Sequence, residues 1–101
     1  SVQLFIENVK KNDKGAIAAK LSFPLKVRPP TETTSQYLES KSEFYYFYEL
    51  LFTEEFRKEI SEAGIQDVST NGITFRLSVK HGFVGFDVFG NIREISNQEN
   101  P

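Results

Sequence analysis

The spacing of the apolar residues changes near Ile65, and this change limits the fold more than any other feature of the chain. From there on, apolar and polar residues alternate in short runs, as they do in strands that are buried on one face. The run at 73–79 (ITFRLSV) is the clearest. Three glycine-containing pairs separate the runs: Asn71-Gly72, His81-Gly82 and Gly90-Asn91. The C-terminal part, up to residue 96, is therefore predicted to form four antiparallel strands joined by hairpin turns.

Helical spacing dominates the N-terminal part. Apolar residues at i, i+3, i+4 and i+7 predict a helix over residues 2–9, and Asp13 is a suitable N-cap for a second short helix. Residues 40–43 have the composition of a capping box ahead of an aromatic helix at 41–52. A further helix is expected behind Thr53, which can cap it.

One strand is predicted among the helices. Residues 23–27 alternate between apolar and polar side chains, and Pro24, which has no N–H to donate, indicates an edge strand or the start of a strand. We expect residues 23–27 to form an additional edge strand. Residues 31–39 are polar and predict a loop or a short edge strand. The expected fold is a single α+β domain over residues 1–96, with N-terminal helices packed on a curved antiparallel sheet, followed by a polar tail at 97–101. The aromatic helix should fill the concave side of that sheet.

Charge and composition exclude several functions. The net charge of −2 and pI near 5.4 argue against a nucleic-acid partner. Residues 1–30 carry a net charge of +4, from six bases and two acids, whereas residues 31–70 carry −6, from three bases and nine acids. These segments form either two solvated faces or a dipole that steers a charged partner or a second copy. No apolar run approaches the length of a membrane span, so membrane insertion is not expected.

The residue types present leave few options for catalysis or metal binding. The chain has no cysteine, which excludes a thiol nucleophile and Cys-based zinc sites. His81 is the single histidine and falls in a predicted turn, so neither a catalytic triad nor metal ligation is expected. The carboxylate pairs Glu54-Glu55 and Glu59-Glu62 should be solvated on a helix, and no cofactor is expected.

Asp87 is the one carboxylate inside an apolar strand run. It either faces outward or lies in the concave side of the sheet, where Asp87 and a tyrosine such as Tyr48 would form a ligand-binding or acid–base pair. Tyr45 and Tyr46 lie off the apolar stripe of their helix. They are either surface rings or part of a partner contact, to which the acidic pair Glu54-Glu55 would add.

Three segments together resemble a known family: residues 21–27 (LSFPLKV), 42–53 (SEFYYFYELLFT) and 90–95 (GNIREI). They are similar to small bacterial proteins of the NTF2-like (cystatin-like) superfamily. The resemblance implies a cone of helices on a bent sheet, often paired as a homodimer. It also implies roles found among the relatives, which are exported proteins of unknown activity, accessory or toxin-neutralising immunity modules, and isomerases that use Asp and Tyr.

We therefore expect a non-enzymatic module that binds a protein partner, in an accessory or immunity-type role. The alternative is a small-molecule binder or an isomerase/lyase-type enzyme that uses the cone cavity, or a domain whose site is shared with a larger protein. The chain begins at Ser1 and contains no methionine, which indicates a processed or trimmed form. Export or a periplasmic location is accordingly favoured over the cytoplasm.

Overall fold

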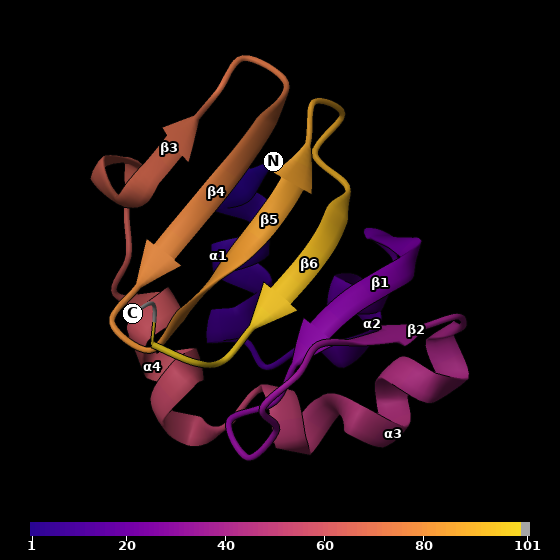
Figure 1. The fold of residues 1–101 in the computed structure, drawn as a ribbon. Coiled ribbons are helices and arrows are strands. Elements are labelled where there is room, and N and C mark those ends of the chain that lie inside the picture. Colours follow the sequence, from indigo (N-terminus) through magenta and orange to yellow (C-terminus); the bar gives the residue numbers. More distant parts are fainter. Residues whose placement is uncertain (100–101) are drawn as a thin grey trace.

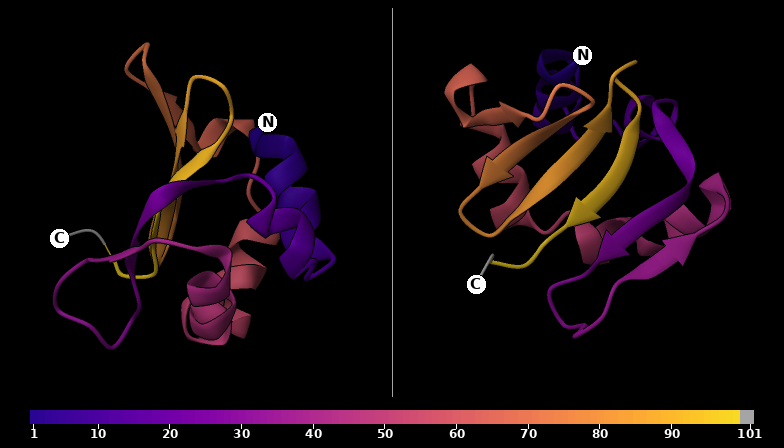
Figure 2. Two further views of the ribbon diagram at one scale, coloured as in Figure 1. Left: turned by 90° about the vertical axis from the view of Figure 1, so that its right-hand side faces the viewer. Right: turned by 45° about the horizontal axis from the view of Figure 1, so that its top comes forward.

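A computed structural model describes residues 1–99 and has an α+β architecture, as predicted. Within these residues, four helices pack on one face of a six-stranded sheet (Figures 1 and 2). The helices are α1 (Val2–Lys10), α2 (Lys14–Ala18), α3 (Lys41–Leu51) and α4 (Glu54–Ser61), with a short 3-10 turn η1 (Ile65–Asp67) after α4. The strands are β1 (Leu21–Arg28), β2 (Gln36–Leu38), β3 (Val68–Thr70), β4 (Thr74–Val79), β5 (Gly82–Asp87) and β6 (Ile92–Ser96).

The sheet is mixed, with the strand order β2-β1-β6-β5-β4-β3. The meander β3 to β6 is antiparallel as predicted, and β2 is the short edge strand that was one option for residues 31–39. However, β1 pairs in parallel with β6, so the prediction of a purely antiparallel sheet is wrong. The edge position predicted for β1 is also wrong. Pro24 is tolerated inside the sheet because the pairing with β6 shifts register between Leu21 and Lys26.

Side chains near the helix N-termini cap the helices as the sequence predicts. The Asp13 carboxylate accepts a hydrogen bond from the Ala16 N–H (3.0 Å), and Thr53 Oγ1 accepts one from the Phe56 N–H (3.2 Å). Ser40 caps α3 in the same way, while the Glu43 side chain accepts from the N–H of residue 39 rather than 40. The longest helix has 11 residues, and none among residues 1–99 combines the length and apolar character needed to cross a bilayer.

Aromatic rings fill the space between the helices and the sheet. The ring centroid of Phe52 lies 5.0 Å from that of Tyr48 and 6.3 Å from that of Phe44. Tyr48 and Phe44 belong to α3 and pack this helix into the core. Phe5 of α1 meets Phe86 of β5 edge-on at 5.5 Å. All five side chains are buried, and each ring removes a large apolar area from water. Aromatic rings are therefore among the largest side chains of the core in a chain of modest hydrophobic content.

Candidate functional site

The face of the sheet away from the helices is open and is the first candidate site (Figure 2). Strand register assigns residues to this face, because directly opposed residues point to the same side. The opposed pairs here are Thr74 and Asp87, Arg76 and Gly85, Ser78 and Phe83, and Lys26 and Glu94. This face is thus mostly polar and charged, whereas the opposite face carries the apolar core.

A groove of about 450 Å³ lies on this face, next to the β3–β4 and β5–β6 turns. Its lining includes Arg76, Phe83 and Arg93 from the strands and Ile73, Val88 and Phe89 from the turns. The turn side chains are strongly exposed, with 72% of Ile73 and 86% of Phe89 accessible to solvent. Figure 1 shows these turns projecting beyond the body of the sheet. Exposed apolar side chains gathered at one groove mark an interaction surface.

Side-chain hydrogen bonds hold both turns in place. In the β3–β4 turn, Asn71 Oδ1 accepts from the N–H groups of Ile73 and Thr74, both at 2.9 Å. In the β5–β6 turn, Asp87 Oδ1 accepts from the N–H groups of Phe89 and Asn91, also at 2.9 Å. Such turns are pre-organised by their Asn and Asp side chains. The apolar tips are therefore presented from fixed backbone.

Asp87, predicted as a ligand-binding residue, lies at the edge of this groove. Although partial burial raises the pKa of its carboxyl group, hydrogen bonds from Asn91 and Phe89 and the charge of Arg93 more than offset this, so the pKa is lowered overall. The carboxylate thus stabilises the β5–β6 turn by accepting its backbone N–H groups, and Arg93 Nη1 lies 3.8 Å from Asp87 Oδ2.

Tyr48, the other predicted ligand-binding residue, is buried among the helices on the covered side of the sheet. Its hydroxyl donates to Asn12 Oδ1 at 2.5 Å, and its ring stacks on Phe52. Burial, together with the charges of Glu49 and Asp13, raises the pKa of the Tyr48 hydroxyl against the opposing effect of Arg57. The structure does not bring Tyr48 and Asp87 together, because the sheet lies between them.

The predicted partner-binding residues lie on the helical side of the molecule. Tyr45 and Tyr46 are exposed on α3, Tyr46 to 85%. Glu54 and Glu55 are exposed in the first turn of α4. None of these four residues lines the sheet groove.

The open face carries more positive than negative charge. Lys26 is 3.8 Å from Glu94, and Arg93 pairs with Asp87. Arg76 instead lies over the ring of Phe83, 3.7 Å from its centroid. Among residues 1–99, neither Arg76 nor Arg28 has a carboxylate within 4.0 Å. Arg28 Nη2 donates instead to the Thr33 carbonyl oxygen (2.9 Å). Arg76 is therefore the guanidinium group on this face whose charge favours an acidic partner.

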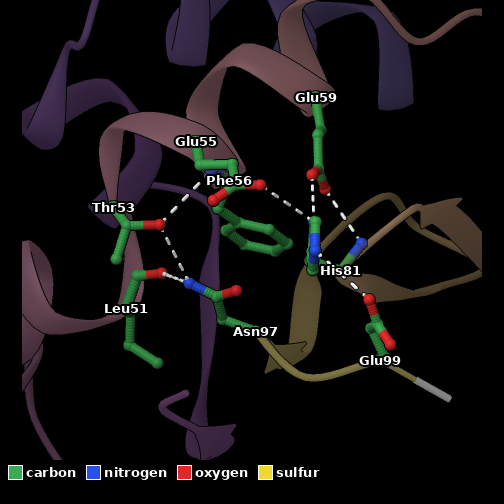
Figure 3. Close-up of polar contacts among 8 residues, drawn as sticks. All are labelled: Leu51, Thr53, Glu55, Phe56, Glu59, His81, Asn97 and Glu99. Carbon is green, nitrogen blue, oxygen red and sulfur yellow. Dashed lines mark hydrogen bonds and ion pairs between the residues drawn. The ribbon is translucent and has the colours of Figure 1, made fainter. Parts of the chain in front are cut away.

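His81 is the centre of a second cluster, at the opposite end of the sheet (Figure 3). Its backbone N–H donates to Glu59 Oε1 (2.9 Å), and its Nδ1 contacts Glu59 Oε2. Nδ1 also lies 3.4 Å from Glu55 Oε1, and Nε2 lies 3.2 Å from Glu99 Oε1. The hydrogen bond with Glu59 and the nearby carboxylates raise the pKa of His81, although partial burial opposes this.

The sequence places His81 correctly in a turn but does not reveal its neighbours. Glu59 was predicted to be solvated; this is wrong, because only 15% of its side chain is exposed. The i, i+4 spacing of Glu55 and Glu59 puts both on one face of α4, which is a readable signal. Their approach to His81, which lies 22 residues after Glu59, depends on how α4 packs against the β4–β5 turn.

No protein-family model matches the chain, and no curated protein matches it significantly. The function is therefore inferred from the two surface regions themselves: the groove on the open face and the cluster around His81.

Proposed function

We propose that this chain is a non-enzymatic module that binds a partner protein through the groove on the open face of the sheet. The carrying observation is that Ile73, Val88 and Phe89 are exposed around that groove, on turns held by side-chain hydrogen bonds. Leaving three apolar side chains in water is unfavourable, and a partner that covered them would remove this cost.

The composition of the groove favours a protein over a small molecule. Small ligands are usually held in pockets that bury most of their surface. Here the space between helices and sheet is filled by rings such as Phe44, Phe52 and Phe56, whereas the groove lies open on the surface. An exposed aromatic next to arginine, as with Phe89 and Arg76, is typical of the side chains that anchor protein interfaces.

The charge of the face favours an acidic partner rather than a second copy. A face-to-face dimer would bring the positive faces of both copies together, with Arg76 unmatched by a carboxylate. A partner with apolar and acidic side chains would match both the apolar turns and Arg76. An accessory or toxin-neutralising role, as implied by the NTF2-like resemblance, needs only such a blocking contact.

Site-specific photocrosslinking in the protein's native cells tests the proposal. Phe89 is replaced by photoreactive p-benzoylphenylalanine, and in a matched chain Tyr46 is replaced instead, because both side chains are almost equally exposed. One defined adduct is expected from position 89, and none from position 46. In the position-89 chain, the substitution Arg76→Glu should reduce the adduct at least about tenfold, since it reverses the charge that faces the partner.

Two outcomes would overturn the proposal. An adduct formed only from position 46 would assign binding to the helical side. A crosslink between two copies of this chain, together with a dimer mass in light scattering, would show that the groove binds a second copy and not an acidic partner.

A further inference from the structure

We propose that His81, Glu55 and Glu59 form a binding site for a divalent transition-metal ion, with Zn²⁺ as the best match. The site lies at the β4–β5 turn, at the opposite end of the sheet from the groove (Figures 1 and 3). It is independent of the proposed partner binding, and it departs from the sequence-based expectation of no metal.

The ligand atoms of the three side chains already lie about as close together as those of a metal site. One ligand atom from each of them lies within 4.8 Å of the other two. Neighbouring ligands of a tetrahedral Zn²⁺ are roughly 3.3–3.5 Å apart, given Zn–N and Zn–O bonds of about 2.0–2.2 Å. The 3.4 Å between His81 Nδ1 and Glu55 Oε1 meets this value. A cation would sit between Nδ1 and the two carboxylates and replace the contact of Nδ1 with Glu59.

Neighbouring groups orient the ligands. Glu99 lies 3.2 Å from His81 Nε2 and can accept a hydrogen bond from an N–H there, which leaves the Nδ1 lone pair for a metal. The His81 backbone N–H donates to one oxygen of Glu59 and leaves the other oxygen directed at Nδ1. Carboxylate–histidine–metal arrangements of this kind fix the ring and its tautomer in known zinc sites.

The charge around the site favours a cation. Three carboxylates, from Glu55, Glu59 and Glu99, approach a single imidazole. The adjoining surface cavity of about 350 Å³ is lined by Thr53, Asn97 and Gln98 besides Glu55, His81 and Glu99, and its lining contains no lysine or arginine. The cavity leaves room for a water molecule as the fourth ligand. One nitrogen and two oxygens suit Zn²⁺ better than Mg²⁺ or Ca²⁺, which prefer oxygen alone.

The test uses the whole chain, stripped of metal with a chelator, and ZnCl₂ as the probe. Because His81 is the only histidine, every imidazole signal in a ¹⁵N NMR spectrum belongs to it. Zinc should shift the Nδ1 resonance at one equivalent, while Nε2 keeps its proton. Calorimetry should give a stoichiometry of one, and zinc should raise the melting temperature because it binds only the folded chain.

Variants separate the site from nonspecific binding. His81→Gln and Glu59→Gln should weaken zinc binding more than about tenfold, the loss that even an outer partner of a metal ligand commonly causes. Glu55→Gln should also weaken it, and this variant should fold normally because 71% of the side chain is exposed. Glu54→Gln is the matched control, since Glu54 is exposed one residue earlier in the same helical turn.

The zinc affinity of Glu54→Gln should equal that of the unaltered chain. The proposal is overturned if millimolar zinc leaves the His81 ring signals unchanged. It is also overturned if Glu54→Gln and Glu55→Gln bind zinc equally well, because the cluster would then be an ion-pair network and not a metal site.

Discussion

The two faces of the sheet are made by the same strands but from opposite kinds of residue. Opposed pairs on the covered face are apolar and buried: Leu77 with Val84, Phe86 with Ile92, and Val27 with Ile95. Opposed pairs on the open face include Thr74 with Asp87 and Lys26 with Glu94. Since side chains alternate along a strand, each strand contributes to both faces at once.

This difference teaches that stability and surface chemistry can be changed separately in this chain. The covered face holds the helices through ring packing, and its residues cannot change without opening cavities. The open face and its turns contribute less to stability, and their residues are therefore available for recognition. The comparison is testable by paired substitutions, one on each side of the sheet.

The largest difference is expected between two phenylalanines. Phe56 of α4 is fully buried, so Phe56→Ala should lower the free energy of unfolding by about 3–5 kcal/mol. Phe89 is exposed, so Phe89→Ala should change it by only about 0.5 kcal/mol. Urea unfolding followed by circular dichroism measures both values. Equal losses would show that the turn tip is part of the core and would remove the distinction between the faces.

Two glycines of β5 give the next contrast. Gly82 has φ 156°, and a Cβ built there would lie 1.9 Å from the Ser96 carbonyl oxygen, which is a backbone atom. Gly82→Ala should therefore destabilise the fold by about 1–3 kcal/mol, as overpacking does. At Gly85, on the open face, the nearest atom would be the Glu94 Cβ at 3.4 Å, an ordinary contact.

Gly85→Ala serves as the control for the Gly82 substitution, and both are measured by the urea midpoint. Gly85→Ala should leave the midpoint nearly unchanged. If it proved as damaging as Gly82→Ala, the open face would be as tightly packed as the covered one.

A smaller effect is expected at Arg76, whose guanidinium group covers the Phe83 ring on the open face. Arg76→Ala removes this cover and should cost about 0.5–1 kcal/mol, in the range for exposed cation–π contacts. Arg76→Lys keeps a cation and an aliphatic stem, so it should retain part of the stability. If Arg76→Ala has no effect on thermal unfolding, the cation contributes nothing to the fold and is free for a partner.

The covered face was largely readable from the sequence, because the apolar period of each element identifies its buried side. The helix caps at Asp13, Ser40 and Thr53 were also predicted correctly, because each cap bonds only to a backbone N–H three residues further along the chain. The position of β1 in the sheet was not predicted correctly. Proline suggested an edge, but a register shift let the strand pair on both sides, and strand order depends on contacts distant in the sequence.

The surface sites were less predictable, because they form between segments distant in the sequence. Nothing local connects His81 with Glu59, and the approach of α4 to the β4–β5 turn decides their contact. The groove likewise needs two turns side by side, each carrying an exposed apolar residue such as Ile73 or Phe89. Exposed apolar residues in turns were a visible signal, since hairpin turns usually carry polar side chains.

The smallest effect is expected from the protonation of Asp87 on the open face. The lowered pKa of Asp87 means that the folded chain favours the charged carboxylate, which accepts the hydrogen bonds of the β5–β6 turn. Its stabilising contribution is therefore complete above the ordinary aspartate pKa of about 3.9 and is lost as the pH falls through the lower pKa of the folded state. The covered face is apolar and has no corresponding group at these strand positions.

Asp87→Asn isolates this contribution, because the amide cannot change its charge. The urea midpoint of the variant should lie slightly below that of the unaltered chain at pH 7. This difference should shrink as the pH falls below about 4, where the Asp87 carboxyl group of the unfolded chain begins to gain its proton while that of the folded chain is still charged. Two midpoint curves that stay parallel from pH 7 to pH 2 would mean that the charge of Asp87 does not hold the turn. The fixed presentation of Phe89 beside the groove would then have to come from the backbone alone.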